Sequence, residues 1–566
     1  MVADCATIMV ADCATIMVGQ FPTITVKSAT NTQWLPIAQP QRFAALFLSS
    51  CKITFMKRET SLVSFLLPRL QDILFILTFY TVILLGSNLF RDGDPGRHII
   101  IGKYILQTLT IVAPATTMVA QSATTIPTRD IFSYTMAGQP LTPHEWLAQV
   151  SYGAGFLALG LNGVVLIAVI LIAGTTTLVY QEILRRTTSP LFSLGFALLA
   201  ASATMIHWLA RPHLFTFLYV AFWTPRLSRL SRGESVPLWH FPVIMLLWAN
   251  THGAFIAGFV IWGAYLAEYL WSHFTQAQKP DRRILRNLLI AGGTSFLATF
   301  INPVGWRLWT TSTGYITNRY LVDLTSEYRS PDFHQPGAWP FILLLTLALF
   351  ALSQAWKKLP LAEGLLLTGW AFLGIYSARN IPLFAIVTTP ILADYSQPLV
   401  ERISLFQKID RQVIAIEQQL RGFLWPLLVI LLVAALLVAG HNLDAQKQGY
   451  QFNSTEFPVG AANWLEGHPQ EGNMFDYFPW GGYLLYRFWP AQRVFIDGQL
   501  DFYGEAFTRK YEQILSADKG WEDLVAQYHI EWMLIPPDSP IAITLRADPA
   551  WVSLYEDQTA IIFRQR

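Results

Sequence analysis

The sequence predicts an α-helical polytopic membrane protein with a C-terminal soluble α/β domain. Only 13% of its residues are charged and 53% are hydrophobic, whereas soluble domains carry about 25% charged residues. Long apolar segments recur between residues 72 and 440, while residues 441–566 are richer in charges and turn signals. The apolar content excludes a disordered chain. A formal net charge of +2 argues against nucleic acid as a partner.

The first 55 residues look like a non-native or repetitive extension. The octapeptide MVADCATI stands at 1–8 and again at 9–16, and a degraded copy recurs at 115–125. Solenoid repeats have periods of about 20–50 residues and need about three copies, so we interpret the tandem as translated repetitive DNA. We expect the biological chain to start at Met56. A secretory signal is the alternative, but 1–55 lack its charged-then-apolar layout.

Residues 56–440 form the predicted transmembrane domain. A spanning helix needs about 17–25 apolar residues, and the chain offers about eleven such segments. They are 72–90, 161–180, 190–209, 212–223, 236–249, 252–271, 287–302, 339–355, 361–377, 380–394 and 423–440. The segments 212–223 and 380–394 are short, so they are half-spans or borrow flanking residues. Residues 146–160 are typical of an interfacial helix.

The orientation follows from the basic residues of the short loops. Lys and Arg are denser in the loops that share a side with residues 56–71 than in the loops on the other side, which favours a cytoplasmic N-terminus. With an odd number of spans, residues 441–566 then lie outside the cell. We therefore expect an integral protein of the plasma (inner) membrane with an extracytoplasmic C-terminal domain.

The C-terminal residues 441–566 read as one α/β domain of ordinary size. Short β-rich runs alternate with a helical pattern in WEDLVAQYHI. The predicted strands are Tyr483–Phe488, Arg493–Ile496, Trp532–Ile535 and Ala560–Phe563.

The long first outer loop, 91–145, carries the first candidates for chemistry. Asp92 and Asp94 are two residues apart, and Asp130 and Glu145 follow. A carboxylate at a membrane surface can act as a general base toward an acceptor hydroxyl or bind a divalent cation. The alternative is a solvated loop that turns at glycine and proline.

Arginines and histidines at the ends of apolar segments form a second set. Arg211, Arg307 and Arg379 stand beside such segments, and the planar guanidinium suits a phosphate. The alternatives are headgroup anchoring or an ion pair within the bundle. Asn250 and His252 lie at another junction, where His252 either orients a sugar or acceptor or is a structural histidine. Leu324–His334 is an outer loop with Glu327, Asp332 and His334, which either forms part of an acceptor cleft or is an ordinary proline-rich loop.

Several motifs follow one another along residues 70–566. The first loop reads D-x-D-x-x-x-H-x-x-x-G-x-x-I from Asp92 to Ile105, P-x-x-D-x-F-S-Y-T from Pro127 to Thr135, and H-E-W-L from His144. RPHLF, LWANTHG, NPVGW, SPDFH, ARNIPLF, WGGYLLY and VFIDGQLDFYG come later. Their order resembles the GT-C superfamily of membrane glycosyltransferases. The likeness is strongest to a bacterial branch related to protein mannosyltransferases and to the aminoarabinose transferases of lipid A.

The resemblance implies an inverting transfer of one sugar from a polyprenyl-phosphate carrier to a glycan, lipid or protein acceptor on the outer face. The implied base is Asp94, and a divalent cation stays open. The further catalytic candidates are Asp92, Asp130 and Glu145. Arg379 and Arg211 would hold the lipid phosphate, with Arg307 as a third candidate. The residues expected to position the sugar or acceptor are His98, His144, His252 and Asn250.

One departure from that branch bears on activity. The stretch between Ile105 and Pro127 is longer than in the branch and contains the degraded repeat. An insertion near 107–126 that displaces Asp94 from Asp130 would weaken or inactivate the enzyme, because catalysis does not tolerate misplacement by about 1 Å.

The competing class is a non-catalytic membrane scaffold or a transporter of cell-envelope assembly. A transporter is expected to show repeated halves and ionisable residues at mid-span, whereas the polar residues here gather on the outer side. Placement separates the two classes, because a transferase requires Asp94 and Arg379 to lie in one outward-facing site.

Overall fold

The computed structural model describes residues 62–112, 126–355, 358–422, 424–442 and 449–566. The predicted extension 1–55 and the repeat copy at 115–125 lie outside the described residues.

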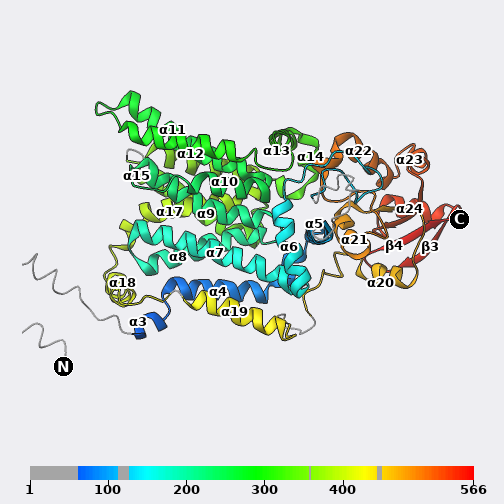
Figure 1. The fold of residues 1–566 in the computed structure, drawn as a ribbon, viewed down its shortest axis with the longest axis horizontal. Helices are drawn as coiled ribbons and strands as arrows, with labels where there is room; N and C mark the ends of the chain where they lie inside the picture. Colours follow the sequence, from blue (N-terminus) through cyan, green and yellow to red (C-terminus); the bar gives the residue numbers. More distant parts are fainter. Residues whose placement is uncertain (1–61, 113–125, 356–357, 423, 443–448) are drawn as a thin grey trace, which may run out of the picture. The chain divides into compact units, whose positions relative to one another are not determined.

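Helices make up most of the described chain as far as residue 438 (Figure 1). In chain order they are α3 (Leu62–Leu66), α4 (Leu70–Leu84), α5 (Asp94–Val112), α6 (Trp146–Leu159), α7 (Leu161–Thr187), α8 (Pro190–Thr204), α9 (His213–Ser231), α10 (His240–Thr251), α11 (Ile256–Thr275), α12 (Arg282–Ala298), α13 (Arg307–Thr317), α14 (Arg319–Leu324), α15 (Trp339–Ala355), α16 (Leu361–Tyr376), α17 (Ile381–Val400), α18 (Ser404–Glu417) and α19 (Leu424–Val438). Each predicted apolar segment overlaps one of these helices, and α6 occupies the predicted interfacial segment.

Within the described residues, 5 helical segments are long and apolar enough to cross a membrane. They are Ser64–Leu84, Leu161–Thr187, Pro190–His207, Gly253–Thr275 and Pro336–Gln354, and Leu361–Tyr376 and Leu424–Val438 are shorter apolar helices. These helices make the chain an integral membrane protein. The total of about eleven spans stays a prediction.

The two segments that looked too short are longer as helices. α9 continues through Pro225 to Ser231, and α17 passes Pro390 and Pro398 to reach Val400. Hydrophobicity ends before the helix does, because the last turns of both helices carry polar residues. Packed neighbours tolerate proline within such helices.

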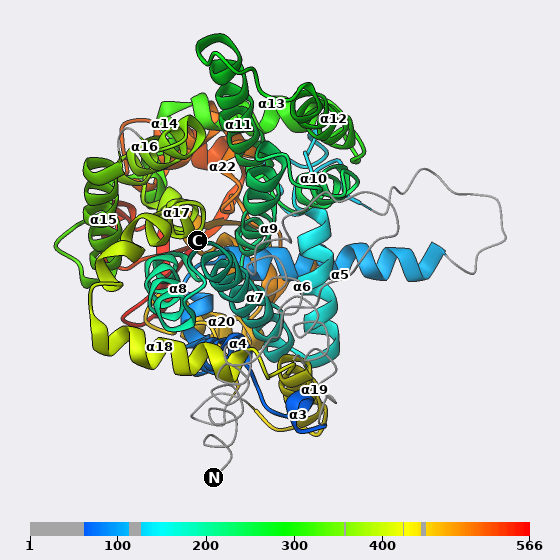
Figure 2. The ribbon, with the colours of Figure 1, turned by 90° about the vertical axis from the view of Figure 1, so that its left-hand side faces the viewer.

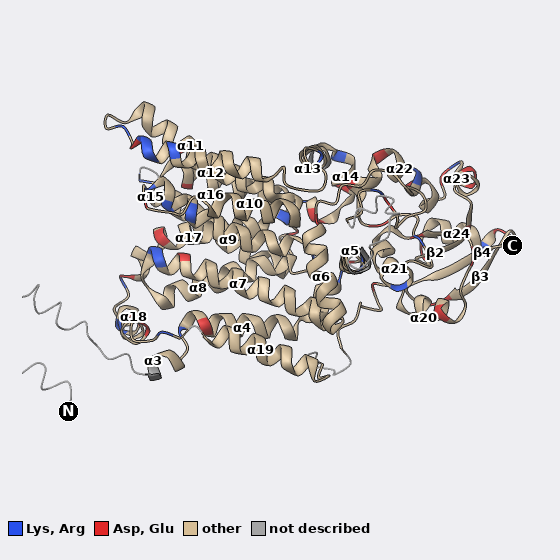
Figure 3. Cartoon of the chain, in the orientation of Figure 1, with Lys and Arg blue, Asp and Glu red and all other residues tan. Residues whose placement is uncertain are grey.

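The helices pack around α7, which contacts α4, α6, α8, α9 and α17. Viewed along the bundle, α5 runs across the other helices at one end, and α18 runs across them at the opposite end (Figure 2). Charged residues gather at the two ends of the bundle and in the C-terminal domain, and the middle is almost free of them (Figure 3). This distribution is typical of a membrane-spanning bundle.

The C-terminal residues form a small mixed sheet with helices. The elements are α20 (Val459–Gly467), β1 (Asn473–Asp476), α21 (Gly481–Phe488), α22 (Leu500–Leu515), α23 (Trp521–Gln527), β2 (Ile530–Ile535), α24 (Pro540–Ala547), β3 (Trp551–Glu556) and β4 (Ile561–Gln565). The strand order is β1-β2-β4-β3, with β1 parallel to β2 and the other two pairs antiparallel. Met533, Ile535 and Phe563 are buried in the core of the domain.

Two of the predicted strands are confirmed and two are wrong. Trp532–Ile535 lies in β2, and Ala560–Phe563 overlaps β4. Tyr483–Phe488 is helical, in α21. The strand prediction failed because a short apolar run does not distinguish a strand from a buried helix. Arg493–Ile496 lies outside the sheet, and its Val494 forms an isolated bridge with Ser133 of the first loop.

Candidate functional site

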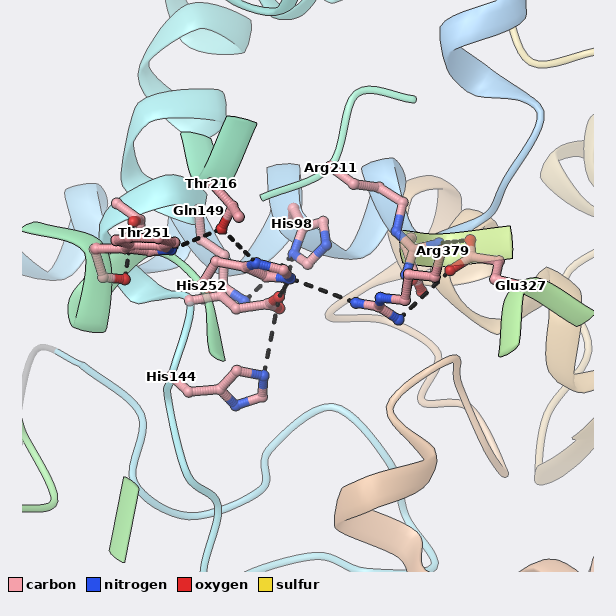
Figure 4. A network of polar contacts seen from close by, with 12 residues as sticks. His98, His144, Gln149, Arg211, Thr216, Thr251, His252, Glu327 and Arg379 are labelled. Atoms are coloured by element: carbon pink, nitrogen blue, oxygen red, sulfur yellow. Dashed lines mark hydrogen bonds and ion pairs between the residues drawn. The ribbon is translucent and has the colours of Figure 1, made fainter. Parts of the chain in front are cut away.

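A network of polar side chains lies where the helices end beside the C-terminal domain (Figure 4). We call it the polar network. Its members are Asp92, Asp94, His98, His144, Glu145, Arg211, His252, Glu327 and Arg379. They come from helix ends and from short connections, including the 3-10 turns η4 (Ser326–Tyr328) and η6 (Ala378–Asn380). Helix ends are where polar groups can gather, because their backbone groups also need partners.

The start of α5 is shaped by its own sequence. The carboxylate of Asp92 accepts a hydrogen bond from the backbone N–H of Asp94 at 3.0 Å, and Pro95 follows within the first turn. An Asx turn before a proline near the helix start is a local signal for beginning a helix. This turn brings both carboxylates to the same helix end.

Arg211 is the hub of the polar network. Its Nη1 lies 2.6 Å from Asp92 Oδ2 and 2.5 Å from Glu327 Oε1, and its Nη2 lies 2.9 Å from Asp94 Oδ2. The Arg211 side chain is only 14% exposed. Three carboxylates thus share one guanidinium.

Two of the carboxyl groups that share Arg211, those of Glu327 and Asp92, have pKa values shifted in opposite directions. Burial alone would raise the pKa of Glu327, but the positive charge of Arg211, with His207 and Arg379, outweighs it and lowers the pKa to about 2. Burial and the charge of Asp94 instead raise the pKa of Asp92 to about 6, although Arg211 acts in the opposite direction. Of Glu327 and Asp92, Glu327 is therefore the carboxyl group that is more readily ionised.

Arg379 continues the network on the other side of Glu327. Its Nη1 lies 3.5 Å from Glu327 Oε2, and its Nη2 donates to His252 Nε2 at 3.4 Å. Its guanidinium also lies 5.0 Å from the centre of the Tyr328 ring. With 25% of its side chain exposed, Arg379 is more accessible than Arg211.

Glu145 lies among three histidines. Its carboxylate oxygens are 3.8 Å from His98 and 3.9 Å from both His144 and His252. Burial, together with Arg97, holds the pKa of His98 well below its usual range, so His98 is neutral. A cavity beside Glu145 is lined by Arg97, Ile101, Pro127, Leu141, Thr142, Pro143, His144, Glu145, Gln149 and Gln499.

Three of the residues predicted for the site lie outside the polar network: Asp130, Asn250 and Arg307. Asp130 accepts hydrogen bonds within its own loop, from Phe132 N at 3.1 Å and from Ser133 Oγ at 2.7 Å. Asn250 accepts from Trp146 Nε1 at 2.7 Å and donates to two backbone carbonyls. These contacts give both residues a structural place.

Arg307 lies at the exposed start of α13. It donates to Thr142 Oγ1 at 3.2 Å, and no contact with the polar network is recorded for it among the described residues. It is therefore the least connected of the three arginines.

The sequence suggested that residues 441–566 cap the site, but it did not identify which of their residues reach the first loop. Arg97, one turn into α5, lies 3.4 Å from Asp497 Oδ2 and donates to the side chain of Gln499. The motif VFIDGQLDFYG marked this segment, but its contact with the first loop could not be read from spacing. Glu327 was visible only as an acid in an outer loop.

Carboxylate oxygens suit a hard divalent cation, but here they are directed at Arg211. Within the described parts of the chain, no group of three or more His, Cys, Asp and Glu side chains is arranged to hold a metal ion.

No protein-family model matches the sequence, and no curated protein matches it. Solved structures do match. The archaeal oligosaccharyltransferase AglB from Archaeoglobus fulgidus, in complex with an inhibitory peptide and a dolichol-phosphate, is similar with a TM-score of 0.52 at 12% identity, over 81% of this chain and 69% of that chain. Its apo form gives a TM-score of 0.51 at the same identity and coverage.

ArnT from Cupriavidus metallidurans, bound to undecaprenyl phosphate, aligns over 87% of this chain and 97% of that chain. Its TM-score is 0.43 at 11% identity. At these identities the likeness concerns the fold alone. The chain has a GT-C-like fold.

Proposed function

We propose that the protein is a membrane glycosyltransferase that moves a sugar from a polyprenyl-phosphate carrier to an acceptor on the outer face of the membrane. The observation that carries the proposal is the unbroken polar network from Asp94 through Arg211 and Glu327 to Arg379. A transferase needs a base and a phosphate-binding cation within one site. The AglB structure, whose ligand is a dolichol-phosphate, supports this kind of donor.

The reaction is a single displacement at the anomeric carbon of the donor sugar. The acceptor oxygen forms the new bond while the bond to the phosphate oxygen breaks, and inversion follows from attack opposite the leaving group. Asp94 takes the proton of the acceptor hydroxyl. The carrier phosphate leaves with the bonding electrons, and Arg379 stabilises the charge that develops on it.

The contacts distribute the remaining roles. Arg211 already donates to three carboxylates, so its first role is to fix Asp94 and Glu327, and the phosphate falls to Arg379. His252 Nε2 accepts a hydrogen bond from Arg379 and lies 3.9 Å from Glu145 Oε1, a place from which His252 can orient the sugar. No step is assigned to a divalent cation.

The first experiment is a thermal-shift titration of the purified full chain with undecaprenyl phosphate. Saturating ligand is expected to stabilise the wild type by about 2.7 kcal/mol at 100 times the dissociation constant, and Arg379→Ala is expected to lose this stabilisation. Undecaprenol, which lacks the phosphate, separates the phosphate contact from binding of the lipid tail. Arg319→Ala is the matched control, because Arg319 is 89% exposed and pairs with nearby Asp323.

A second arm supplies labelled polyprenyl-phosphate sugars and measures transfer in membrane vesicles. A folded wild type that undecaprenyl phosphate stabilises no more than undecaprenol does, and that transfers no sugar, would favour the competing class, a membrane scaffold or transporter.

A further inference from the structure

The C-terminal domain meets the start of α5 through glycines. A Cβ on Gly93 would lie 2.5 Å from Pro479 O, and a Cβ on Gly482 would lie 2.4 Å from Gly93 O. A Cβ on Gly96 would lie 2.6 Å from Gly482 O. The two backbones therefore touch directly, and side chains at these positions would separate them. The position of the D-G-D-P-G turn is set by the C-terminal domain as well as by the bundle.

The segment between Arg493 and Gln499 also holds the second half of the first loop. The backbone N–H of Val494 donates to Phe132 O at 3.3 Å, and Tyr134 N donates to Val494 O at 3.2 Å. Thr135 Oγ1 donates to Phe495 O at 2.6 Å. One segment of the C-terminal domain thus binds both halves of the first loop, on either side of residues 113–125.

Gly498 lies directly against the carboxylate of Asp94. A Cβ at Gly498 would lie 2.2 Å from Asp94 Oδ1, so this oxygen fills the space that a side chain would need. The other oxygen, Oδ2, lies 2.9 Å from Arg211. The Asp94 carboxylate is held between Gly498 and Arg211.

The residues on either side of Gly498 contact the same helix, α5, one turn further along. Asp497 and Gln499 both contact Arg97, and Asp497 Oδ1 also accepts from Gln499 N at 2.9 Å. All three side chains are buried. Because breaking a buried ion pair is costly, the contacts of Asp497 and Gln499 with Arg97 set the distance between Gly498 and Asp94.

We propose that Asp497, Gly498 and Gln499 are positioning residues of the transfer site and that the C-terminal domain is a working part of that site. Gly498 leaves the room that Asp94 Oδ1 occupies, while Asp497 and Gln499 hold α5 through Arg97. The proposal rests on the proposed function, because it assigns Asp94 the role of base.

The test begins with Gly498→Ala in the full chain. The added methyl displaces the carboxylate, so kcat is expected to fall by about 100-fold, while stabilisation by undecaprenyl phosphate stays unchanged because Arg379 is untouched. Gly467→Ala is the matched control: Gly467 lies in the same domain with nothing within 4 Å of its added Cβ, and we expect it to retain full activity. Wild-type kcat in Gly498→Ala would overturn the proposal.

A double-mutant cycle separates positioning from a general loss of structure. On the background of Asp94→Asn, the change Gly498→Ala is expected to alter the residual rate by no more than about twofold, because the displaced side chain can no longer act as a base. Equal losses on both backgrounds would mean that Gly498 acts independently of Asp94, which contradicts the proposal.

A chemical readout keeps this test separate from the proposed function. Carbodiimide labelling of Asp94, followed by mass spectrometry, is expected to be slow in the wild type, where this side chain is 15% exposed, and severalfold faster in Gly498→Ala. The exposed Asp332 is the internal standard. Unchanged labelling of Asp94 would overturn the positioning even in a protein that transfers sugar. Faster labelling of Asp94 in Gly498→Ala, together with a wild type that transfers no sugar, would support the positioning role and refute the transferase.

Discussion

Asp92 and Glu327 lie far apart in the sequence, yet both accept a hydrogen bond from the same nitrogen of Arg211, at 2.6 and 2.5 Å. With Asp94 at 2.9 Å, the guanidinium is surrounded by more negative charge than it can neutralise. Arg379, on the far side of Glu327, supplies a second positive charge. The first loop and the turns at η4 and η6 are therefore tied together by electrostatics.

Replacing the hub should cost more than removing an ordinary ion pair. Arg211→Met leaves three partly buried carboxylates without their partner, and we expect a loss of about 3 kcal/mol in stability. Arg319→Ala, whose ion pair is exposed, should cost no more than about 1 kcal/mol. Thermal unfolding of both purified variants measures the difference. Equal effects would show that Arg211 does not hold the network together.

Two of the predicted acids should respond differently to amide substitution. Asp94→Asn is expected to lower kcat by about 100-fold or more and to leave stabilisation by undecaprenyl phosphate intact. Asp130→Asn should act mainly on stability, because its carboxylate accepts hydrogen bonds inside its own loop. Transfer assays and melting curves of both variants check this division. Full transfer activity in Asp94→Asn would remove Asp94 from the mechanism.

The crossing of α5 and α6 depends on two glycines. A Cβ on Gly102 would lie 1.8 Å from Gln149 O, and a Cβ on Gly153 would lie 2.5 Å from Gly102 C. Small residues permit such close approach of membrane-protein helices. We expect Gly102→Ala to force the helices apart and to lower both the melting temperature and the activity. Gly195→Ala, with nothing within 4 Å of its added Cβ, should leave both unchanged.

Asp497 gives the stability of the protein a pH dependence. Burial raises the pKa of Asp497 to about 6, although the nearby Arg97 opposes the rise. Its folded pKa exceeds the unfolded value of 3.8, so its contribution to stability is fully present below pH of about 4 and is lost as the pH rises through about 6.

Asn mimics the protonated acid at this position. Asp497→Asn should therefore gain stability relative to the wild type as the pH rises from about 4 to about 7, by about 3 kcal/mol for a shift of about two pKa units. Melting curves of both proteins across this range measure the change. A constant difference between them would contradict the shifted pKa.

The predicted orientation can be tested with single cysteines. The C-terminal domain and α18 lie at opposite ends of the bundle (Figure 1). Starting from a chain in which Cys5, Cys13 and Cys51 are replaced by serine, a membrane-impermeant maleimide should label Lys519→Cys in intact cells. It should label Lys408→Cys, in α18, only after permeabilisation. The reverse pattern would place the N-terminus outside.

Much of the helical architecture could be predicted from the sequence. At each apolar run that was predicted to span the membrane, from α4 to α19, the structure has a helix. Apolar runs are a strong signal because a bilayer requires long apolar helices. The extent of α9 beyond residue 223 was not predictable from hydropathy, since its last turns are polar. In the C-terminal domain, Tyr483–Phe488 was predicted as a strand but is helical, in α21, which packs against α5 through Gly482.

The site was predictable in its parts. The motifs pointed to Asp94, Glu145, Arg211, His252 and Arg379, and the structure brings all of them into the polar network. Glu327 was singled out only with Asp332 and His334, for an acceptor cleft. Its contact with Arg211 was not predictable, because the contact joins segments that are far apart in the sequence.

By itself the sequence determined that this chain enters a membrane and that its polar chemistry gathers between helices, because scarce charges and long apolar runs act through local composition. Only the tertiary structure decided which of those polar residues meet. Arg211 and Glu327, and likewise Asp94 and Gly498, are joined through the packing of distant segments. The energy of such contacts depends on geometry and burial, and neither is written in the spacing of residues along the chain.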